Sequence, residues 1–367
     1  MRIAGGGPPD TAWAEGLTVA VPNALLEATG LARAVDARGD LRLPGDLPPI
    51  DPRFAEELRM RSAFTPHPPA SSRLPFSYRF VPGPLRRAVA SAIGRRHRRQ
   101  VDRWAAFPGW PLDLSADLLQ DLASPGAGAR AASPTPVILT HDIDSPDGLR
   151  SLAGAFLPIE ESCGARSTSY VVPCAWPLDE GLLREVRDRG HELGIHGYDH
   201  ANRTPFAAAA ERLARLDAAR PLAERFGMSG YRAPSLLRTR ALLEDLAPRY
   251  RYDSSVPTSG GLFPVPNNGC ASARPFRIGG LLEIPITLPR DGSLRFLGHT
   301  PDEILRTWQA CAGLVARSGG VVVLLTHCER HFSGNAAMLN AYRAFLEWAH
   351  GNARFTFGTP AGVLARA

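Results

Sequence analysis

The sequence predicts an α/β protein built around a parallel sheet. After residue 136, short apolar runs that favour strands alternate with longer segments of helical periodicity. This alternation places successive strands parallel, in an open sheet or a closed barrel. The region before residue 124 differs, because it is punctuated by proline and holds only helical pieces. We therefore expect a large α/β domain preceded by an α-rich N-terminal extension or small domain.

The apolar runs and helical segments alternate along most of the α/β domain. Thr300 is the expected N-cap of one helix, and Pro301 fits its first position. Gly190 ends another helix. The expected strands are 136–140, 167–173, 191–200 (a strand leading into a loop), 228–235, 281–289, 321–327 and 353–360. The expected helices are 178–190, 204–227, 239–250, 300–319 and 335–351.

A segment rich in small residues and proline, SPGAGARAASPTP at 124–136, predicts a linker. It divides the chain into an N-terminal region at 1–123 and an α/β domain at 137–367. The N-terminal region has helical pieces near 51–62, 84–104 and 114–123 and carries no catalytic pattern. Its role is therefore open at this stage, and it could cover one end of the sheet or bind a partner.

Every basic residue in the chain is arginine, since the 367 residues include no lysine. This excludes enzymes that need a lysine amine, such as Schiff-base enzymes, P-loop proteins and kinases. The net charge of +6 is concentrated in residues 86–103, which hold seven arginines and one aspartate. The segment is either a solvated helix face or a contact for an anionic membrane face or a phosphorylated substrate. Nucleic acid is not expected, because only Phe80 and Trp104 accompany the arginines.

The five cysteines favour a reducing compartment. They are odd in number and form no CxxC pair, which argues against a disulfide scaffold or a cysteine-based zinc site. The N-terminus shows no apolar signal region, and no apolar run approaches the roughly 18 residues of a membrane helix. We expect a cytoplasmic protein.

Polar side chains follow three of the expected strands. Asp142 and Asp144 come directly after 136–140, His196 and His200 follow the third strand, and His327 ends the run at 321–327. Because the carboxyl ends of parallel strands meet at one edge of a sheet, these groups should converge.

The expected cluster suits a divalent metal ion. Two neighbouring carboxylates repel each other unless a cation lies between them, and histidines at i and i+4 can share one cation. One aspartate with two histidines leaves room for water and substrate, as in catalytic Zn²⁺ sites. Each pattern alone also has an ordinary structural reading, as a cap or a loop. The neighbouring His191–Glu192 pair does not begin a zinc-protease motif, because position 195 is Ile195.

The motifs together resemble the polysaccharide deacetylase family, carbohydrate esterase family four. The segments that carry the resemblance occur in the family's order: LTHDID, HELGIHGYDH, GYRAPS, YRYDSS, LLEIPIT and VVLLTH. The resemblance covers about residues 134–367. The first motif, in which one residue separates the two aspartates, resembles that of a D-x-D subgroup of the family. The resemblance implies a distorted (β/α) barrel of about seven parallel strands. It also implies a hydrolase that removes N-acetyl groups from amino sugars, or less often cleaves O-acetyl or other small amide bonds.

The resemblance also assigns roles to residues of this chain. Asp142 corresponds to the catalytic base that takes a proton from the attacking water, and Arg232 to the arginine that holds this base. His327 corresponds to the general acid for the leaving amine, and Asp253 to the carboxylate that orients that histidine. Asp144, His196 and His200 correspond to the metal triad, for which Zn²⁺ is expected.

Several departures from the family pattern bear on the substrate. Ile143 separates the two aspartates, Gly197 replaces a Ser or Thr that braces the histidine loop, and Ser235 replaces a Tyr. No tryptophan follows the DSS segment. A short substrate, such as a nucleotide- or lipid-linked amino sugar for surface polysaccharide biosynthesis, is favoured over a long glycan. Two alternatives stay open: a hydrolase of another small amide or formyl group, and a catalytically dead barrel that acts as a binding or assembly protein.

Overall fold

The α/β domain contains one sheet of nine strands, whose parallel pairings confirm the predicted fold class. The computed structural model describes residues 1–4, 7–73, 80–104, 112–124, 134–260, 263 and 268–365. The strand order is β6-β7-β5-β4-β3-β2-β1-β8, with β9 also paired to β1. Every pairing is parallel except β6 with β7. The strands are β1 Thr135–Ile143, β2 Thr168–Val171, β3 Glu192–His196, β4 Gly230–Arg232, β5 Tyr252–Asp253, β6 Phe276–Ile278, β7 Leu281–Glu283, β8 Val322–His327 and β9 Phe355–Gly358.

The sheet curls into a distorted barrel, and residues after β7 bridge its two ends. The sequence predicts a strand over 281–289, but β7 ends at Glu283. Pro285 and Pro289 lack the N–H groups that a regular ladder needs. The chain between them still reaches β8, because Leu288 N–H donates to the Val323 carbonyl (3.1 Å) and Val323 N–H donates to the Thr287 hydroxyl (2.7 Å). The closure is therefore irregular.

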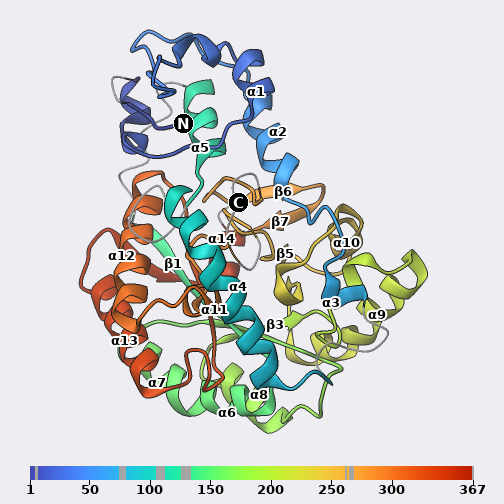
Figure 1. Cartoon of the computed structure of the whole chain (residues 1–367). Coiled ribbons are helices and arrows are strands. Elements are labelled where there is room, and N and C mark those ends of the chain that lie inside the picture. The colour runs from blue at the N-terminus through green and yellow to red at the C-terminus, as the bar shows by residue number, and fades with distance from the viewer. Residues whose placement is uncertain are drawn as a thin grey trace.

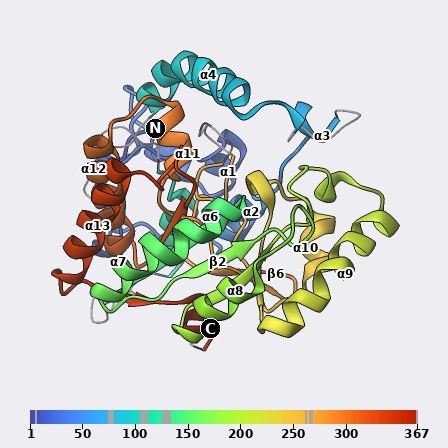
Figure 2. The ribbon, with the colours of Figure 1, turned by 90° about the horizontal axis from the view of Figure 1, so that it is seen from below.

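Helices lie outside the curled sheet. Figures 1 and 2 show α12 and α13 along one side and α9 and α10 along the other. The expected N-cap of α12 is confirmed, since Thr300 and Glu303 form a reciprocal capping box. The helices of this domain are α6 Pro146–Ser151, α7 Leu157–Ser162, α8 Glu180–Asp188, α9 Ala209–Phe226, α10 Arg240–Leu246, α11 Asp291–Phe296, α12 Pro301–Arg317, α13 Ala336–His350 and α14 Pro360–Leu364.

The N-terminal region is helical, as predicted. Figure 1 shows α1, α2 and α5 beyond the sheet end that carries β6, whereas α4 runs along the α/β domain. No helix in the described ranges is both long enough and apolar enough to cross a membrane. The helices of this region are α1 Asn23–Ala28, α2 Arg53–Ser62, α3 Ala70–Arg73, α4 Gly83–Trp104 and α5 Ser115–Ala123.

Helix α5 is attached to the α/β domain by buried polar contacts. Asp121 forms a two-pronged ion pair with Arg274, with both N–O distances at 2.8 Å. Asp117 accepts the Ala273 N–H at 2.8 Å. The predicted linker at 124–136 is too long at its C-terminal end, because β1 already begins at Thr135. Residues 125–133 of that linker lie outside the described ranges.

Candidate functional site

The strand register brings four of the predicted side chains to one edge of the sheet. In β1 and β8, Asp142 is paired with His327, the last residue of β8. In β3 and β4, His196 is paired with Arg232, and each is the last residue of its strand. These strands are parallel, so their carboxyl ends face the same side. The local sequence thus places each group where its strand stops.

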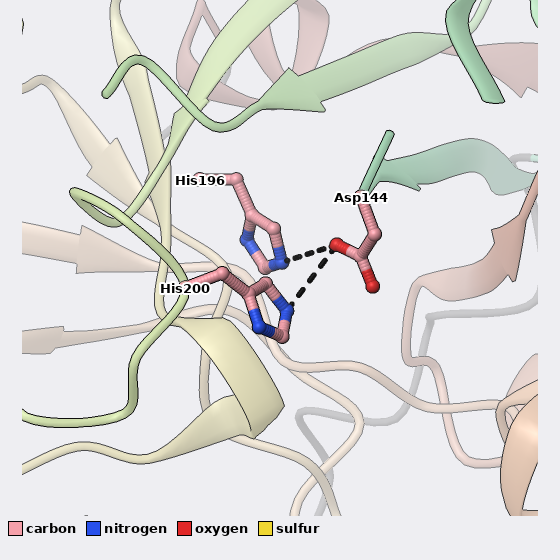
Figure 3. Close-up of side chains that lie close together, drawn as sticks. All are labelled: Asp144, His196 and His200. Atoms are coloured by element: carbon pink, nitrogen blue, oxygen red, sulfur yellow. Dashed lines mark ion pairs between the residues drawn. The ribbon is translucent and has the colours of Figure 1, made fainter. Parts of the chain in front are cut away.

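Asp144, His196 and His200 form a cluster that can hold a metal ion. One potential ligand atom from each residue lies within 4.8 Å of the others. As Figure 3 shows, both imidazoles face the Asp144 carboxylate, with Oδ1 at 3.5 Å from His196 Nε2 and 3.2 Å from His200 Nε2. This is the set of residues that the sequence nominated.

The second nitrogen of His196 is fixed by the neighbouring strand. Its Nδ1 donates to the Arg232 carbonyl at 3.0 Å, which turns Nε2 towards Asp144. Nε2 is buried and has no hydrogen-bond partner among the described residues. A buried ring nitrogen without a partner is costly unless a ligand satisfies it. The donor set of one carboxylate and two imidazoles therefore fits a divalent ion.

Burial and neighbouring charges shift the pKa values of the three cluster residues in different directions. Burial lowers the pKa of His196, which favours the neutral imidazole that a metal requires. Burial also disfavours a charged His200, but the Asp144 carboxylate outweighs it and raises the pKa of His200. Burial alone would raise the pKa of Asp144, whereas the charges of His200 and His196 hold it below its usual range. These shifts favour an ionised Asp144, and the raised pKa of His200 means that a metal ion competes with a proton for this imidazole.

His196 and His200 are joined by a bent loop. Gly197 has φ of 67° and His200 has φ of 57°. A Cβ atom on Gly197 would lie 2.4 Å from Cδ of Pro234. Glycine is therefore required here by both the backbone conformation and the close approach. The absence of a Ser or Thr at this position follows from that packing.

Asp142 is held by a fully buried arginine. Arg232 Nη1 donates to Asp142 Oδ1 at 3.1 Å, and its Nε donates to the Ser254 carbonyl at 2.8 Å. The guanidinium also lies over the Tyr170 ring, 4.2 Å from its centroid. The hydrogen bond to the buried guanidinium fixes the orientation of the Asp142 carboxylate. The structure brings these two residues together as the resemblance implies.

The carboxylate that contacts His327 is Asp291, which corrects the prediction of Asp253. His327 Nδ1 donates to Asp291 Oδ1 at 2.7 Å, and its backbone N–H donates to Oδ2 at 2.9 Å. Asp253 instead accepts from the hydroxyl and N–H of Ser255, at 2.7 and 3.0 Å. It faces Glu283 on β7, and burial raises the pKa of Asp253. Asp253 therefore stabilises the chain after β5.

Asp291 favours the protonated form of His327. Burial disfavours the charged imidazolium, but the charge and hydrogen bond of Asp291 outweigh it and raise the pKa of His327 to about 9. Since Asp291 holds Nδ1, Nε2 is the nitrogen left to act on a substrate. Asp291 follows the predicted strand 281–289 by two residues, which is the signal that could have identified it.

Glu329 is a second residue that sequence reasoning missed. Its Oε1 accepts the Asp144 N–H at 3.0 Å and the Ser145 hydroxyl at 2.9 Å. Burial and the Asp144 charge raise the pKa of Glu329 to about 7. It therefore positions the Asp144 loop. Its place two residues after His327, at the same strand end, is the signal that could have identified it.

Two further histidines are structural. His141 contacts Thr326 (2.9 Å) and Glu160 (2.7 Å) and is fully buried. His191 contacts the N–H of Ser167 at 3.0 Å. Both lie outside the metal-capable cluster, so neither supplies a further ligand.

Comparisons with known proteins show the fold. No protein-family model matches the chain, and no curated protein matches it. Among solved structures, the chain is similar to Puue allantoinase, with 17% identity, a TM-score of 0.50, and coverage of 66% of this chain and 94% of that one. It is also similar to a candidate polysaccharide deacetylase from Mycobacterium smegmatis, with 20% identity, a TM-score of 0.49, and coverage of 64% and 93%. A carbohydrate esterase of family four from Streptomyces lividans matches with 17% identity, a TM-score of 0.41, and coverage of 62% and 93%.

Proposed function

We propose that the protein is a metal-dependent hydrolase of the polysaccharide deacetylase type, which removes an N-acetyl group from an amino sugar. The observation that carries this proposal is the joint placement of three kinds of group at one sheet edge. A paired carboxylate, Asp142, and a histidine held by a carboxylate, His327, sit opposite each other on β1 and β8. The metal-capable cluster of Asp144, His196 and His200 lies beside them.

The geometry supports amide hydrolysis by acid and base residues in separate roles. A divalent ion, for which Zn²⁺ is the expected choice, would lower the pKa of a water molecule and polarise the amide carbonyl. Asp142 accepts the proton of the attacking water, and Arg232 holds this carboxylate in place through the hydrogen bond to Oδ1. His327 donates a proton to the departing amine, which is a poor leaving group without it. Asp291 orients the imidazole and supplies the charge that keeps it protonated.

The substrate proposed is a short N-acetylated sugar on a nucleotide or lipid diphosphate carrier, used in the biosynthesis of a surface polysaccharide. Support comes from the departures noted in the sequence, which remove side chains that line a long glycan groove in the family. Ser235 also has φ of 53°, so the backbone at this corner of the site is fixed in an unusual conformation. Its backbone N–H is the candidate donor to the developing oxyanion.

The proposal is tested by acetate release from nucleotide- and lipid-linked acetamido sugars, with product masses as a second readout. Asp142→Asn and His327→Ala are each expected to lower kcat by about 100-fold or more. The matched controls are Asp147→Asn and His350→Ala, which change exposed residues of the same types. Full turnover by both site variants would refute the mechanism.

A second candidate, hydrolysis of another small amide, is favoured by the similarity to Puue allantoinase. The same purified protein should therefore be assayed on a panel that includes allantoin and small formyl and acetyl amides. If one of these amides is hydrolysed and no acetate is released from the sugars, that amide is the substrate class. The roles proposed for the residues stay the same. A dead barrel would show neither turnover nor stabilisation by added Zn²⁺.

A further inference from the structure

Among the described residues, the most exposed large apolar side chains lie just before α4 and in its first half. Within the described ranges, the large hydrophobic residues classed as exposed are Phe80 (79%), Leu85 (55%), Val89 (51%) and Ile93 (43%). The last three recur every four residues and therefore form one stripe on the helix. Scattered exposed apolar residues are ordinary, but a stripe of this kind marks an interaction surface.

The opposite face of α4 is the one that packs on the protein. Gly94 is buried, and a Cβ there would lie 2.1 Å from the Phe296 carbonyl oxygen of α11. His97 stacks on Phe263 with 5.4 Å between ring centroids, and Arg98 Nη1 donates to the Leu297 carbonyl at 3.3 Å. These contacts turn Leu85, Val89 and Ile93 outward, and Figure 2 shows α4 at the outer edge of the molecule.

The outward stripe is bordered by positive charge. Arg86, Arg95 and Arg96 are exposed beside it, and residues 83–98 contain no acidic residue. Long arginine side chains can lie along an apolar surface while their guanidinium groups reach outward. An apolar face flanked by arginine on a surface helix is the arrangement that lies in the interface of an anionic bilayer.

Helix α4 also borders the candidate active site. It packs against α11, whose first residue is Asp291, the partner of His327. Burial and then the charge of Arg87 lower the pKa of His331, which follows His327 by four residues. A surface that engages the outward face of α4 is therefore separated from α11 and Asp291 only by the helix itself.

We propose that the outward face of α4 binds an anionic lipid surface and so presents the active site to a lipid-linked substrate. This inference rests on the proposed function for its substrate and on charge complementarity for its occupant. The bilayer would receive Leu85, Val89 and Ile93, and the arginines would contact the lipid phosphates. Of the two proposed carriers of the sugar, nucleotide and lipid diphosphate, this inference favours the lipid diphosphate.

The test is co-sedimentation of the purified full-length protein with vesicles. We expect binding to vesicles of phosphatidylcholine mixed with phosphatidylglycerol, and little binding to phosphatidylcholine alone. Arg86→Gln/Arg95→Gln/Arg96→Gln should lower the partition coefficient by roughly 100-fold, given the contribution of each arginine near an anionic surface. A matched control, Arg33→Gln/Arg251→Gln/Arg306→Gln, removes the same charge from exposed sites elsewhere. Its partition coefficient should stay close to that of the parent protein.

A second variant, Leu85→Ser/Val89→Ser/Ile93→Ser, separates insertion from charge attraction. It should also lower binding by at least about 10-fold, since the transfer of each apolar side chain is lost. Circular dichroism and thermal melting of every variant verify the fold. Equal binding to neutral and anionic vesicles, no binding to either, or self-association through α4 that the serine variant abolishes would each overturn the proposal.

The same experiment distinguishes failure of the surface from failure of the proposed function. Asp144→Asn removes a metal-capable ligand, yet it should bind anionic vesicles as the parent protein does. If vesicle binding fails while acetate release from soluble sugars persists, the inference about α4 is wrong and the hydrolase stands. If the protein binds vesicles but releases no acetate, the proposed hydrolase function is wrong and the inference about α4 stands.

Discussion

Replacing Asp291 with Asn should move the pH dependence of catalysis by a defined amount. The pKa of His327, about 9, lies about 2.5 above the ordinary histidine value, which corresponds to roughly 3 kcal/mol in favour of the imidazolium. Because burial opposes this charge, the increase depends on the carboxylates, of which Asp291 is in direct contact. In Asp291→Asn the pKa should therefore fall to about 6.5 or below.

The sign of the effect follows from the role of His327 as an acid. Its protonated form is active, so activity in the parent should fall as pH rises through about 9. In the variant this alkaline limb should lie near pH 6.5, which gives a loss of about 30-fold at about pH 8 and little loss at about pH 6. The same interaction contributes to folding stability below about pH 6.5 and is lost as pH rises through about 9.

The assay is kcat/KM against pH at saturating Zn²⁺, together with an NMR titration of the His327 ring. Ser333→Ala is the control, because Ser333 donates to Asp291 Oδ2 (2.7 Å) and leaves the pair with His327 in place. Its alkaline limb should move by less than that of the Asn variant. An alkaline limb that stays near pH 9 in a folded Asp291→Asn protein would refute the role given to Asp291.

Two further predictions concern the metal-capable cluster and its loop. Zn²⁺ should raise the melting temperature more at about pH 7.5 than at about pH 5.5, because the metal displaces a proton from His200, whose pKa is raised; equal shifts in differential scanning fluorimetry at the two pH values would contradict this. Gly197→Ala should cost more than about 2 kcal/mol of unfolding free energy, since it adds a contact with Pro234 to an unfavourable φ. Gly227→Ala has a similar φ of 65° but an open surrounding, so it should cost only about 1 kcal/mol in the same denaturant titration.

The convergence of the candidate site residues could be predicted from the sequence because it follows from one rule. Parallel strands end at one edge, and the residues in question stand at strand ends, so their convergence needs no knowledge of packing. Asp142, His196 and His327 each lie in the last two residues of a strand. The apolar runs at 136–140 and 321–327 identify two of these strands in the sequence, β1 and β8.

The partner of His327 could not be predicted in the same way. The family resemblance of the YRYDSS segment assigned this role to Asp253, whereas Asp291 stands two residues after the predicted strand 281–289 and belongs to none of the motifs. The decision depends on where β7 stops: with Pro285 and Pro289 interrupting it, the chain crosses to β8 and starts α11 beside His327. That path is set by irregular hydrogen bonds, such as Val323 N–H to the Thr287 hydroxyl, which leave no periodic signal in the sequence.

The orientation of α4 could not be predicted from its sequence pattern either. A stripe of Leu85, Val89 and Ile93 would ordinarily be expected to face the core. The deciding residue is Gly94, because only glycine lets the helix backbone approach the Phe296 carbonyl so closely. Once that face is against α11, the apolar stripe has to point away from the protein. The arginines of residues 86–98, which the sequence could interpret only as a solvated helix face or an anionic contact, thereby lie beside an exposed apolar stripe on a helix that packs against α11.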